Sequence, residues 1–139
     1  MRIELPDIAA QLETVFQAGT KAAIEQLNAN LQAPRLAPQQ EIDEGKYSRT
    51  HLLRDSEGWE PPHPDIVGAY FRHFQLNFVE YNTDKKLAAL LGLRGASTDR
   101  RIRSFKDGGT PVPYGIWRRF LVLTGRVPQD VIPVLAFMG

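Results

Sequence analysis

The chain has 139 residues, of which 42% are hydrophobic and 24% charged, a balance that allows a buried core and excludes a wholly disordered or membrane-like protein. The net charge of +1 conceals an asymmetry, since residues 1–83 hold 7 basic and 12 acidic side chains, whereas residues 84–126 hold 10 basic and 3 acidic ones. Such a basic block beside an acidic half is expected when one face meets a polyanion, although dense basic surfaces also occur without that role.

The first segment, residues 1–31, is predicted to form an amphipathic helix. Its apolar residues recur three or four positions apart, which places them on one helical stripe. Gly19 and Thr20 weaken the middle of the helix and could divide it into two shorter ones. Packing onto its own domain and dimerisation are both open interpretations of the stripe. Its members are Ile8, Leu12, Val15, Phe16, Ala23, Ile24, Leu27 and Leu31.

Residues 32–63 are predicted to be an irregular linker. The segment contains four prolines, two glycines and scattered charges, with no sustained hydrophobic period. His51-Leu52-Leu53 and Trp59 could anchor parts of the linker to a core, so we do not expect it to be disordered.

Residues 64–126 are predicted to hold four helices in quick succession. The first begins at Pro64-Asp65 and carries the strongest core stripe of the chain, whereas His73 lies off that stripe and is expected at the surface. The second is capped by Asn82 or Thr83 and ends at Gly92. The third begins near Ser97 or Thr98 and ends at Gly108-Gly109, and the fourth spans 116–124 with Gly125 as a left-handed cap. The stripe of the first helix comprises Val67, Tyr70, Phe71, Phe74 and Phe78.

The second and third of these helices have the features of a helix-turn-helix. Leu87, Ala88 and Leu91 would form the inner face of the second helix, and Ile102 and Phe105 that of the third. With 3.6 residues per turn, the opposite face of the third helix would enter a DNA groove. Arginine can pair with guanine O6 and N7 and serine can serve base edges, so the base-contact candidates are Ser97, Arg100, Arg103 and Ser104. The phosphate-contact candidates, on the flanks and around the turn, are Lys85, Lys86, Arg94, Arg101 and Lys106.

The stretch LAALLGL, followed by DRRIRSFKDGGTPVP and a tryptophan-containing helix, resembles the Cro/lambda-repressor-like (xenobiotic-response-element-type) helix-turn-helix regulators. In that family the recognition helix ends in an aromatic-x-x-Gly element, which would here be Phe105 to Gly108. The resemblance covers about residues 65–125 and implies a small helical bundle, a bacterial or mobile-element transcriptional regulator and a homodimer on a palindromic operator. The turn departs from the family, because Gly92 and Ile102 are ten positions apart, about four more than usual.

Several other classes of function find no support in the residues. There is no cysteine, and His51, His63 and His73 have no metal-ligand spacing. No Ser/His/Asp order or phosphate-binding glycine loop is present, so we expect neither an enzyme nor a cofactor. No apolar run approaches the roughly 18 to 20 residues of a spanning helix, and the N-terminus lacks signal-peptide features, which favours a cytoplasmic protein with no membrane partner.

The residues thus predict an all-α protein whose domain 64–126 binds duplex DNA sequence-specifically and regulates transcription. The remaining tail, 127–139, is apolar except for Gln129 and Asp130, and its prolines restrict it to a short helix or an extended strap. The alternative is a protein-interaction module on the same helical bundle, with residues 7–31 and the tail making the contacts. Salt dependence separates the two, because phosphate contacts weaken steeply with salt and an apolar interface does not. Any small-molecule effector is unknown.

Overall fold

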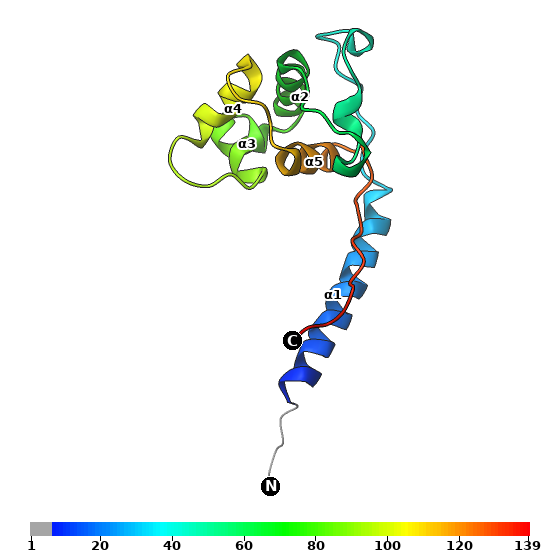
Figure 1. Ribbon diagram of the computed structural model, residues 1–139. Coiled ribbons are helices and arrows are strands. Elements are labelled where there is room, and N and C mark those ends of the chain that lie inside the picture. Colours follow the sequence, from blue (N-terminus) through cyan, green and yellow to red (C-terminus); the bar gives the residue numbers. More distant parts are fainter. Residues whose placement is uncertain (1–6) are drawn as a thin grey trace. The chain divides into compact units, whose positions relative to one another are not determined.

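The computed structural model describes residues 7–139, and these residues form five α-helices and no β-strand (Figure 1). The predicted all-α class and small helical bundle are confirmed. Within the described range, none of the helices combines the length and hydropathy that a membrane span requires. The helices are α1 (Ile8–Asn30), α2 (Pro64–Asn77), α3 (Asp84–Leu90), α4 (Thr98–Asp107) and α5 (Tyr114–Leu123).

The chain divides into two compact units. The bundle unit is Pro38–Val131 and contains α2 to α5. The terminal unit comprises α1, the residues that follow it as far as Ala37, and the tail Ile132–Gly139. The bundle unit is therefore larger than the segment 64–126 that the sequence singled out, since it also takes in residues on either side of that segment.

In the terminal unit, α1 is a single helix that continues through Gly19 and Thr20, where the sequence allowed a break. Asp7 caps its start by accepting a hydrogen bond of 2.7 Å from a backbone N–H of the first turn. No residue of α1 is buried, so its apolar stripe is exposed along the whole helix. One ring contact within this unit joins the helix to the tail, with the centroids of Phe16 and Phe137 4.9 Å apart.

Helix α2 supplies the central stripe of the bundle. It starts as predicted, with Pro64 in the first turn and the Nδ1 atom of His63 accepting the backbone N–H of Asp65 at 3.0 Å. The prediction for Phe78 is wrong: this residue is 41% exposed, because α2 ends at Asn77 and the backbone becomes extended at Phe78. The other four stripe residues are buried: Val67, Tyr70, Phe71 and Phe74.

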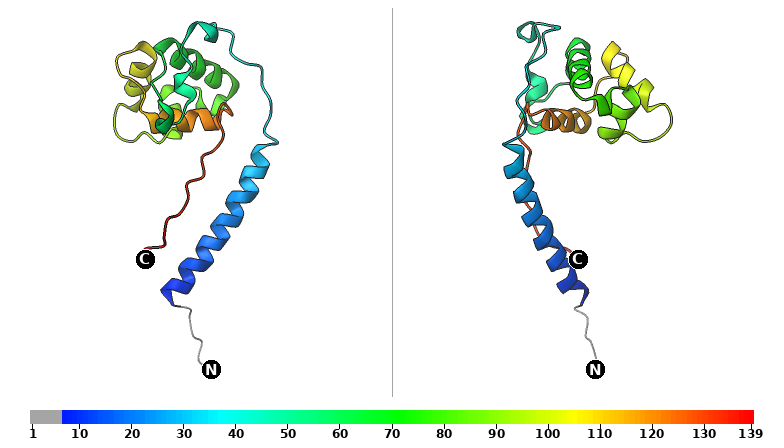
Figure 2. Two further views of the ribbon diagram at one scale, coloured as in Figure 1. Left: turned by 45° about the vertical axis from the view of Figure 1, so that its right-hand side comes forward. Right: turned by 180° about the vertical axis from the view of Figure 1, so that it is seen from behind.

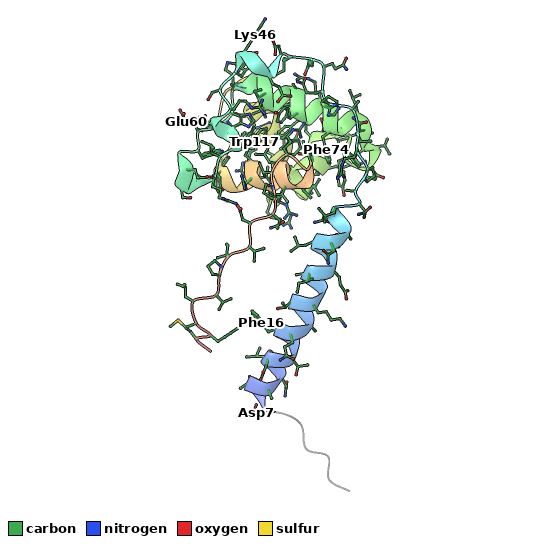
Figure 3. All side chains as sticks on the ribbon, turned by 90° about the vertical axis from the view of Figure 1, so that its right-hand side faces the viewer. Asp7, Phe16, Lys46, Glu60, Phe74 and Trp117 are labelled. Atoms are coloured by element: carbon green, nitrogen blue, oxygen red, sulfur yellow. The ribbon has the colours of Figure 1, made fainter. Side chains whose placement is uncertain are left out.

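The core of the bundle is built around the indole of Trp117, which comes from α5 and has no exposed surface. Its ring stacks on Tyr70 and on Phe120, with centroids 5.8 and 5.5 Å apart. Phe74 packs against the ring of Phe120, and Figure 3 shows the side chains of Phe74 and Trp117 inside the bundle. Burying each large aromatic residue contributes about 2 to 3 kcal/mol, so this cluster is the principal source of the unit's stability.

Helices α3 and α4 pack against each other and are joined by residues 91–97, which form a loop at the side of the bundle (Figure 2). Leu91 and Leu93, at the start of this loop, are buried in the core. Thr83 caps α3 by accepting the N–H of Lys86 at 3.2 Å. Gly92 ends α3 with a φ of 87°, and the N–H of Leu93 returns to the carbonyl of Ala88 at 3.0 Å. This is the Schellman arrangement, which suits glycine because other residues are strained at positive φ.

Helix α5 begins at Tyr114, two residues before the predicted start, directly after Pro113. Its end follows the prediction, because Gly125 adopts a left-handed conformation with a φ of 68°. The N–H groups of Gly125 and Arg126 satisfy two carbonyls of the last turn at 3.1 and 2.9 Å.

Residues 38–63 contain no α-helix, as expected, but they fold against the bundle through three short 3-10 turns. His51 is buried, and the indole N–H of Trp59 donates to its carbonyl at 3.2 Å. Gln39 is also buried, and its side chain bonds to the backbone of Glu41 at 2.8 Å and of Ile42 at 2.9 Å. Of the side chains expected to anchor this segment, His51 is buried and Leu52 and Trp59 pack against the core. The segment is therefore part of the bundle unit.

The start of the tail is also part of the bundle unit. The carboxylate of Asp130 accepts hydrogen bonds from Arg54 at 2.8 Å and pairs with Arg118 at 3.2 Å. Beyond Val131 the chain is extended and exposed, which matches the strap rather than the helix that the sequence left open.

Candidate nucleic-acid interface

Helix α4 has two faces of opposite character. Ile102 and Phe105 are 0% and 2% exposed and pack into the core, as the sequence predicted. Thr98, one turn before Ile102, is also buried. The residues between them turn outward, where Arg100 and Arg103 are exposed. The helix therefore presents arginines to solvent from a backbone that the core holds in place.

The four base-contact candidates have different surroundings. Arg100 and Arg103 share the outer face of α4, and Arg103 donates to the carboxylate of Asp99 one turn away at 3.0 Å. Ser97 is exposed just before α4, with a left-handed φ of 64° and no capping hydrogen bond from its side chain. Ser104 is only partly exposed, and its hydroxyl shares a hydrogen bond of 2.8 Å with that of Thr110. Ser104 thus closes the turn after α4 instead of pointing outward with the arginines.

Four of the five phosphate-contact candidates are exposed: Lys85, Lys86, Arg94 and Arg101. Lys106 differs, because its Nζ atom lies 3.0 Å from each carboxylate oxygen of Asp84 and its side chain is 20% exposed. Its ammonium group is already bound by a carboxylate of α3, so a phosphate would have to compete for it. The structure therefore does not bring Lys106 together with the outer basic surface.

Three further arginines of the basic block, which the sequence analysis did not assign, lie on or after α5. Arg119 is exposed, and its Nε donates to the carbonyl of Leu90 at 2.8 Å, which ties α5 to the end of α3. Arg126 lies with its guanidinium carbon 3.8 Å from the ring centroid of Tyr70, and burial lowers the pKa of this arginine. Arg118 donates to the carbonyl of Leu52 at 3.3 Å and pairs with Asp130. Arg118 and Arg126 hold the bundle together and are not available to a polyanion.

Several titratable groups lie inside the bundle, away from the outer face of α4. Burial, reinforced by the charge of Arg49, lowers the pKa of His51 to about 4, so this histidine is neutral and accepts the indole N–H of Trp117 at 3.2 Å. Burial and the hydrogen bond to Glu44 raise the pKa of Tyr70 to about 12. Burial alone would raise the pKa of Glu44, but the hydrogen bond from Tyr70 and neighbouring positive charges outweigh it and lower that pKa. These groups stabilise the bundle.

A metal centre is not formed by the described residues. Across 7–139, no three histidine or carboxylate side chains come together in a way that could hold an ion. His63 serves as the cap of α2, His51 is enclosed by aromatic rings, and His73 is partly buried on α2.

The site is therefore defined by the outer face of α4 and the exposed cations around it. Beneath this surface Ile102 and Phe105 anchor α4 in the core. Two of the predicted members, Ser104 and Lys106, have structural partners instead. No protein-family model matches the chain, and comparisons with curated proteins and with solved structures also found no match.

Proposed function

We propose that the bundle unit binds duplex DNA sequence-specifically, with α3, residues 91–97 and α4 acting as a helix-turn-helix. The observation that carries the proposal is the outer face of α4, where Arg100 and Arg103 are exposed opposite the buried Ile102 and Phe105. A helix whose inner face is anchored can lie in the major groove and bring arginines to guanine O6 and N7.

The surrounding charge supports the same proposal. Seven of the ten basic residues in 84–126 are exposed, whereas Lys106, Arg118 and Arg126 have partners in the fold. These exposed cations come from α3, the connection after it, α4 and α5, so phosphates on both sides of a groove could be met. They are Lys85, Lys86, Arg94, Arg100, Arg101, Arg103 and Arg119.

Transcriptional regulation is the use that this binding favours. The resemblance of residues 65–125 to Cro/lambda-repressor-like regulators supports it and adds the expectation of a homodimer. In such a dimer the two copies of α4 would meet half-sites about one helical turn apart, and the operator would be a palindrome.

The test is binding of the full chain to duplex DNA by fluorescence anisotropy. An operator is first selected from a random duplex pool, and its affinity is then measured over a range of salt concentrations. We expect a slope of log affinity against log salt of about −3 or steeper, because each neutralised phosphate contributes about −0.9. Arg100→Ala should weaken binding and relax base preference, whereas Lys85→Ala should weaken binding equally on all sequences.

A matched control removes two exposed cations of the terminal unit, with Lys21→Ala and Arg35→Ala combined in one variant. This variant should bind nearly as well as the wild type, whereas Arg100→Ala/Arg103→Ala should lose the selected operator. Absence of binding by the folded wild type at low salt would contradict the proposal. Equal losses in both double variants would show that net charge, and not α4, determines binding.

A second candidate function, protein interaction through α1, is favoured by a different observation. Leu12, Phe16 and Ile24 are each at least half exposed although they lie on one apolar stripe. A helix of this kind is marginal in water unless its stripe is covered. We propose a second copy of the chain as the partner, which would also provide the homodimer expected above.

Sedimentation velocity over a range of protein concentrations tests this self-association. Leu12→Glu places a charge in the stripe and should shift the protein to monomer, whereas Ala18→Glu, on the opposite face of α1, should leave the dimer intact. A wild type that stays monomeric at all concentrations would overturn the dimer and leave DNA binding by the bundle unit unaffected.

A further inference from the structure

The carboxylate of Asp84 joins three helices of the bundle. Both of its oxygens accept hydrogen bonds from the Nζ atom of Lys106 at 3.0 Å, which links α3 to α4. The Nε2 atom of Gln75 donates to the same carboxylate at 3.3 Å and adds the end of α2. Asp84 and Lys106 are each 20% exposed, so the pair is largely shielded from solvent. This cluster is the interhelical clamp.

The clamp connects opposite ends of its two helices. Asp84 lies in the first turn of α3, and Lys106 lies in the last turn of α4. Each charge is of the sign that favours its own helix terminus, so both residues also stabilise the helices that they join. Because the pair is partly buried, salt screens it less than a surface ion pair.

The other ion pair of α4 lacks this role. Arg103 and Asp99 lie one turn apart on the same helix, with 57% and 42% of their side chains exposed. A pair within one exposed helix face contributes little and cannot set the position of that helix on its neighbours. Lys85, next to Asp84 in sequence, is fully on the surface. The clamp joins α4 to a second helix, whereas the pair of Arg103 and Asp99 stays within α4.

We propose that Asp84 and Lys106 are positioning residues that hold α4 on α3 so that Arg100 and Arg103 meet base edges together, and that Lys106 does not contact phosphate. The inference rests on the DNA-binding function proposed above and identifies the contact between α3 and α4 as the source of base specificity. A tilt of α4 moves both arginines relative to the bases, whereas contacts to phosphates tolerate such a shift because they carry no sequence information.

The sharpest test is Asp84→Asn, because a charge effect and a positioning effect predict opposite changes in operator affinity. Removing an acidic residue near a DNA surface should strengthen binding if only net charge matters. If the clamp positions α4, the substitution should instead weaken binding to the selected operator by about five- to tenfold, which lies within the range of coupling between residues in contact. Binding to random duplex DNA should not weaken, because it depends on charge and not on the position of base-contacting arginines. The matched control is Asp107→Asn, which removes an exposed acidic residue of α4 and should not weaken operator binding.

A pair of lysine substitutions provides the second measurement. Lys106→Met keeps the aliphatic chain, removes the ammonium group and should lower operator affinity without changing the salt slope. Lys85→Met, the control, should reduce the magnitude of that slope by about 1. Lys106→Arg should keep the operator affinity that Lys106→Met loses, because a guanidinium can also donate two hydrogen bonds to the Asp84 carboxylate. Circular dichroism establishes whether each variant is folded. If Asp84→Asn does not fold, the operator affinity of Lys106→Met tests the proposal in its place.

The outcomes separate the clamp from the DNA-binding proposal. If the wild type binds DNA but Asp84→Asn strengthens operator binding as Asp107→Asn does, the positioning role is overturned and the proposed function stands. A decrease of the salt slope in Lys106→Met would assign Lys106 to phosphate and also overturn the role. If the folded wild type binds no DNA, both proposals fail. In the expected case Asp84→Asn/Lys106→Met loses no more operator affinity than either single variant, because the two residues act as one unit.

Discussion

Helices α1 and α2 carry the same kind of sequence signal and meet different surroundings. Both place apolar residues three or four positions apart, and both begin with a recognisable cap. Helix α2 has seven buried residues, whereas α1 has none. The comparison teaches that hydrophobic periodicity specifies a helix and the direction of its apolar face, but not whether another element of the same chain covers that face.

The difference follows from what the rest of the chain offers each helix. Three of the four buried stripe residues of α2 are aromatic, and the rings of Trp117 and Phe120 on α5 pack directly onto Tyr70 and Phe71. Helix α1 contains Gly19, around whose ideal Cβ position no atom lies within 4 Å, and none of its residues is buried. The stability of α1 as a helix must therefore come from its N-terminal cap, from its backbone hydrogen bonds and from any protein that covers its stripe.

The largest effect that would sharpen this comparison is expected from Trp117→Ala. Removing a fully buried indole from the centre of the bundle should destabilise the bundle unit by about 3 to 5 kcal/mol. The matched substitution Phe16→Ala, at a half-exposed ring of α1, should cost less than about 1 kcal/mol. Urea unfolding followed by far-ultraviolet circular dichroism measures both. Equal costs would show that α1 is covered in solution as fully as α2.

Acid should destabilise the bundle unit. In the unfolded chain His51 titrates near its ordinary pKa of about 6.5, whereas in the fold its pKa is lowered to about 4. Between these values the unfolded chain binds a proton that the folded chain does not, so stability is full above pH 6.5 and falls by about 3 kcal/mol toward pH 4. The lowered pKa of Glu44 adds a loss in the same direction as the pH falls below about 4.5.

The measurement for this effect is urea unfolding at a series of pH values, with His51→Gln as the comparison. The glutamine variant has no group that titrates at this position, so its stability should be nearly flat between about pH 6.5 and 4.5, at the cost of some packing. A slope equal to that of the wild type would assign the pH dependence to another group.

Replacing a glycine by alanine should change stability in opposite directions in the bundle unit and in α1. Gly92→Ala forces a side chain into a φ of 87° and should destabilise the bundle by about 1 to 2 kcal/mol. Gly19→Ala meets no atom within 4 Å and should stabilise α1 by about 1 kcal/mol. Amide hydrogen exchange reports both, as faster exchange near the end of α3 and slower exchange along α1. Faster exchange of α1 in Gly19→Ala would indicate that a partner helix approaches closely at this glycine.

The smallest effect is expected from deleting residues 1–37. The bundle unit keeps its own core, so its free energy of unfolding should change by less than about 0.5 kcal/mol. Deleting residues 1–63 instead removes His51 and Glu44 from the bundle and should destabilise it by several times that amount. Urea unfolding of the two truncated chains makes the comparison, and a large loss in the first would mean that α1 stabilises the bundle.

Much of the fold could be predicted from local signals. The start of α2 at Pro64, the cap at Thr83 and the left-handed glycines after α3, α4 and α5 all depend on a few neighbouring residues, and all are present. The failure at Phe78 has the same origin, because a helical period cannot show that the backbone will leave the helix one residue earlier.

The candidate site was predictable in part for a related reason. The positions of Arg100 and Arg103 opposite Ile102 and Phe105 follow from helical geometry alone, which is why sequence reasoning found them. The roles of Lys106 and Ser104 did not follow, because their partners Asp84 and Thr110 belong to another helix and to the turn that follows α4.

The helices, their caps and the outer face of α4 can be derived from the amino-acid sequence, because each of these depends on interactions within one or two turns of the chain. Three other features could be seen only in the folded chain: residues 38–63 join the bundle, Arg118 and Arg126 contact the core, and α1 leaves its stripe exposed. Those outcomes depend on contacts between residues far apart in sequence, and the free energy of such contacts depends on which surfaces meet when the chain folds.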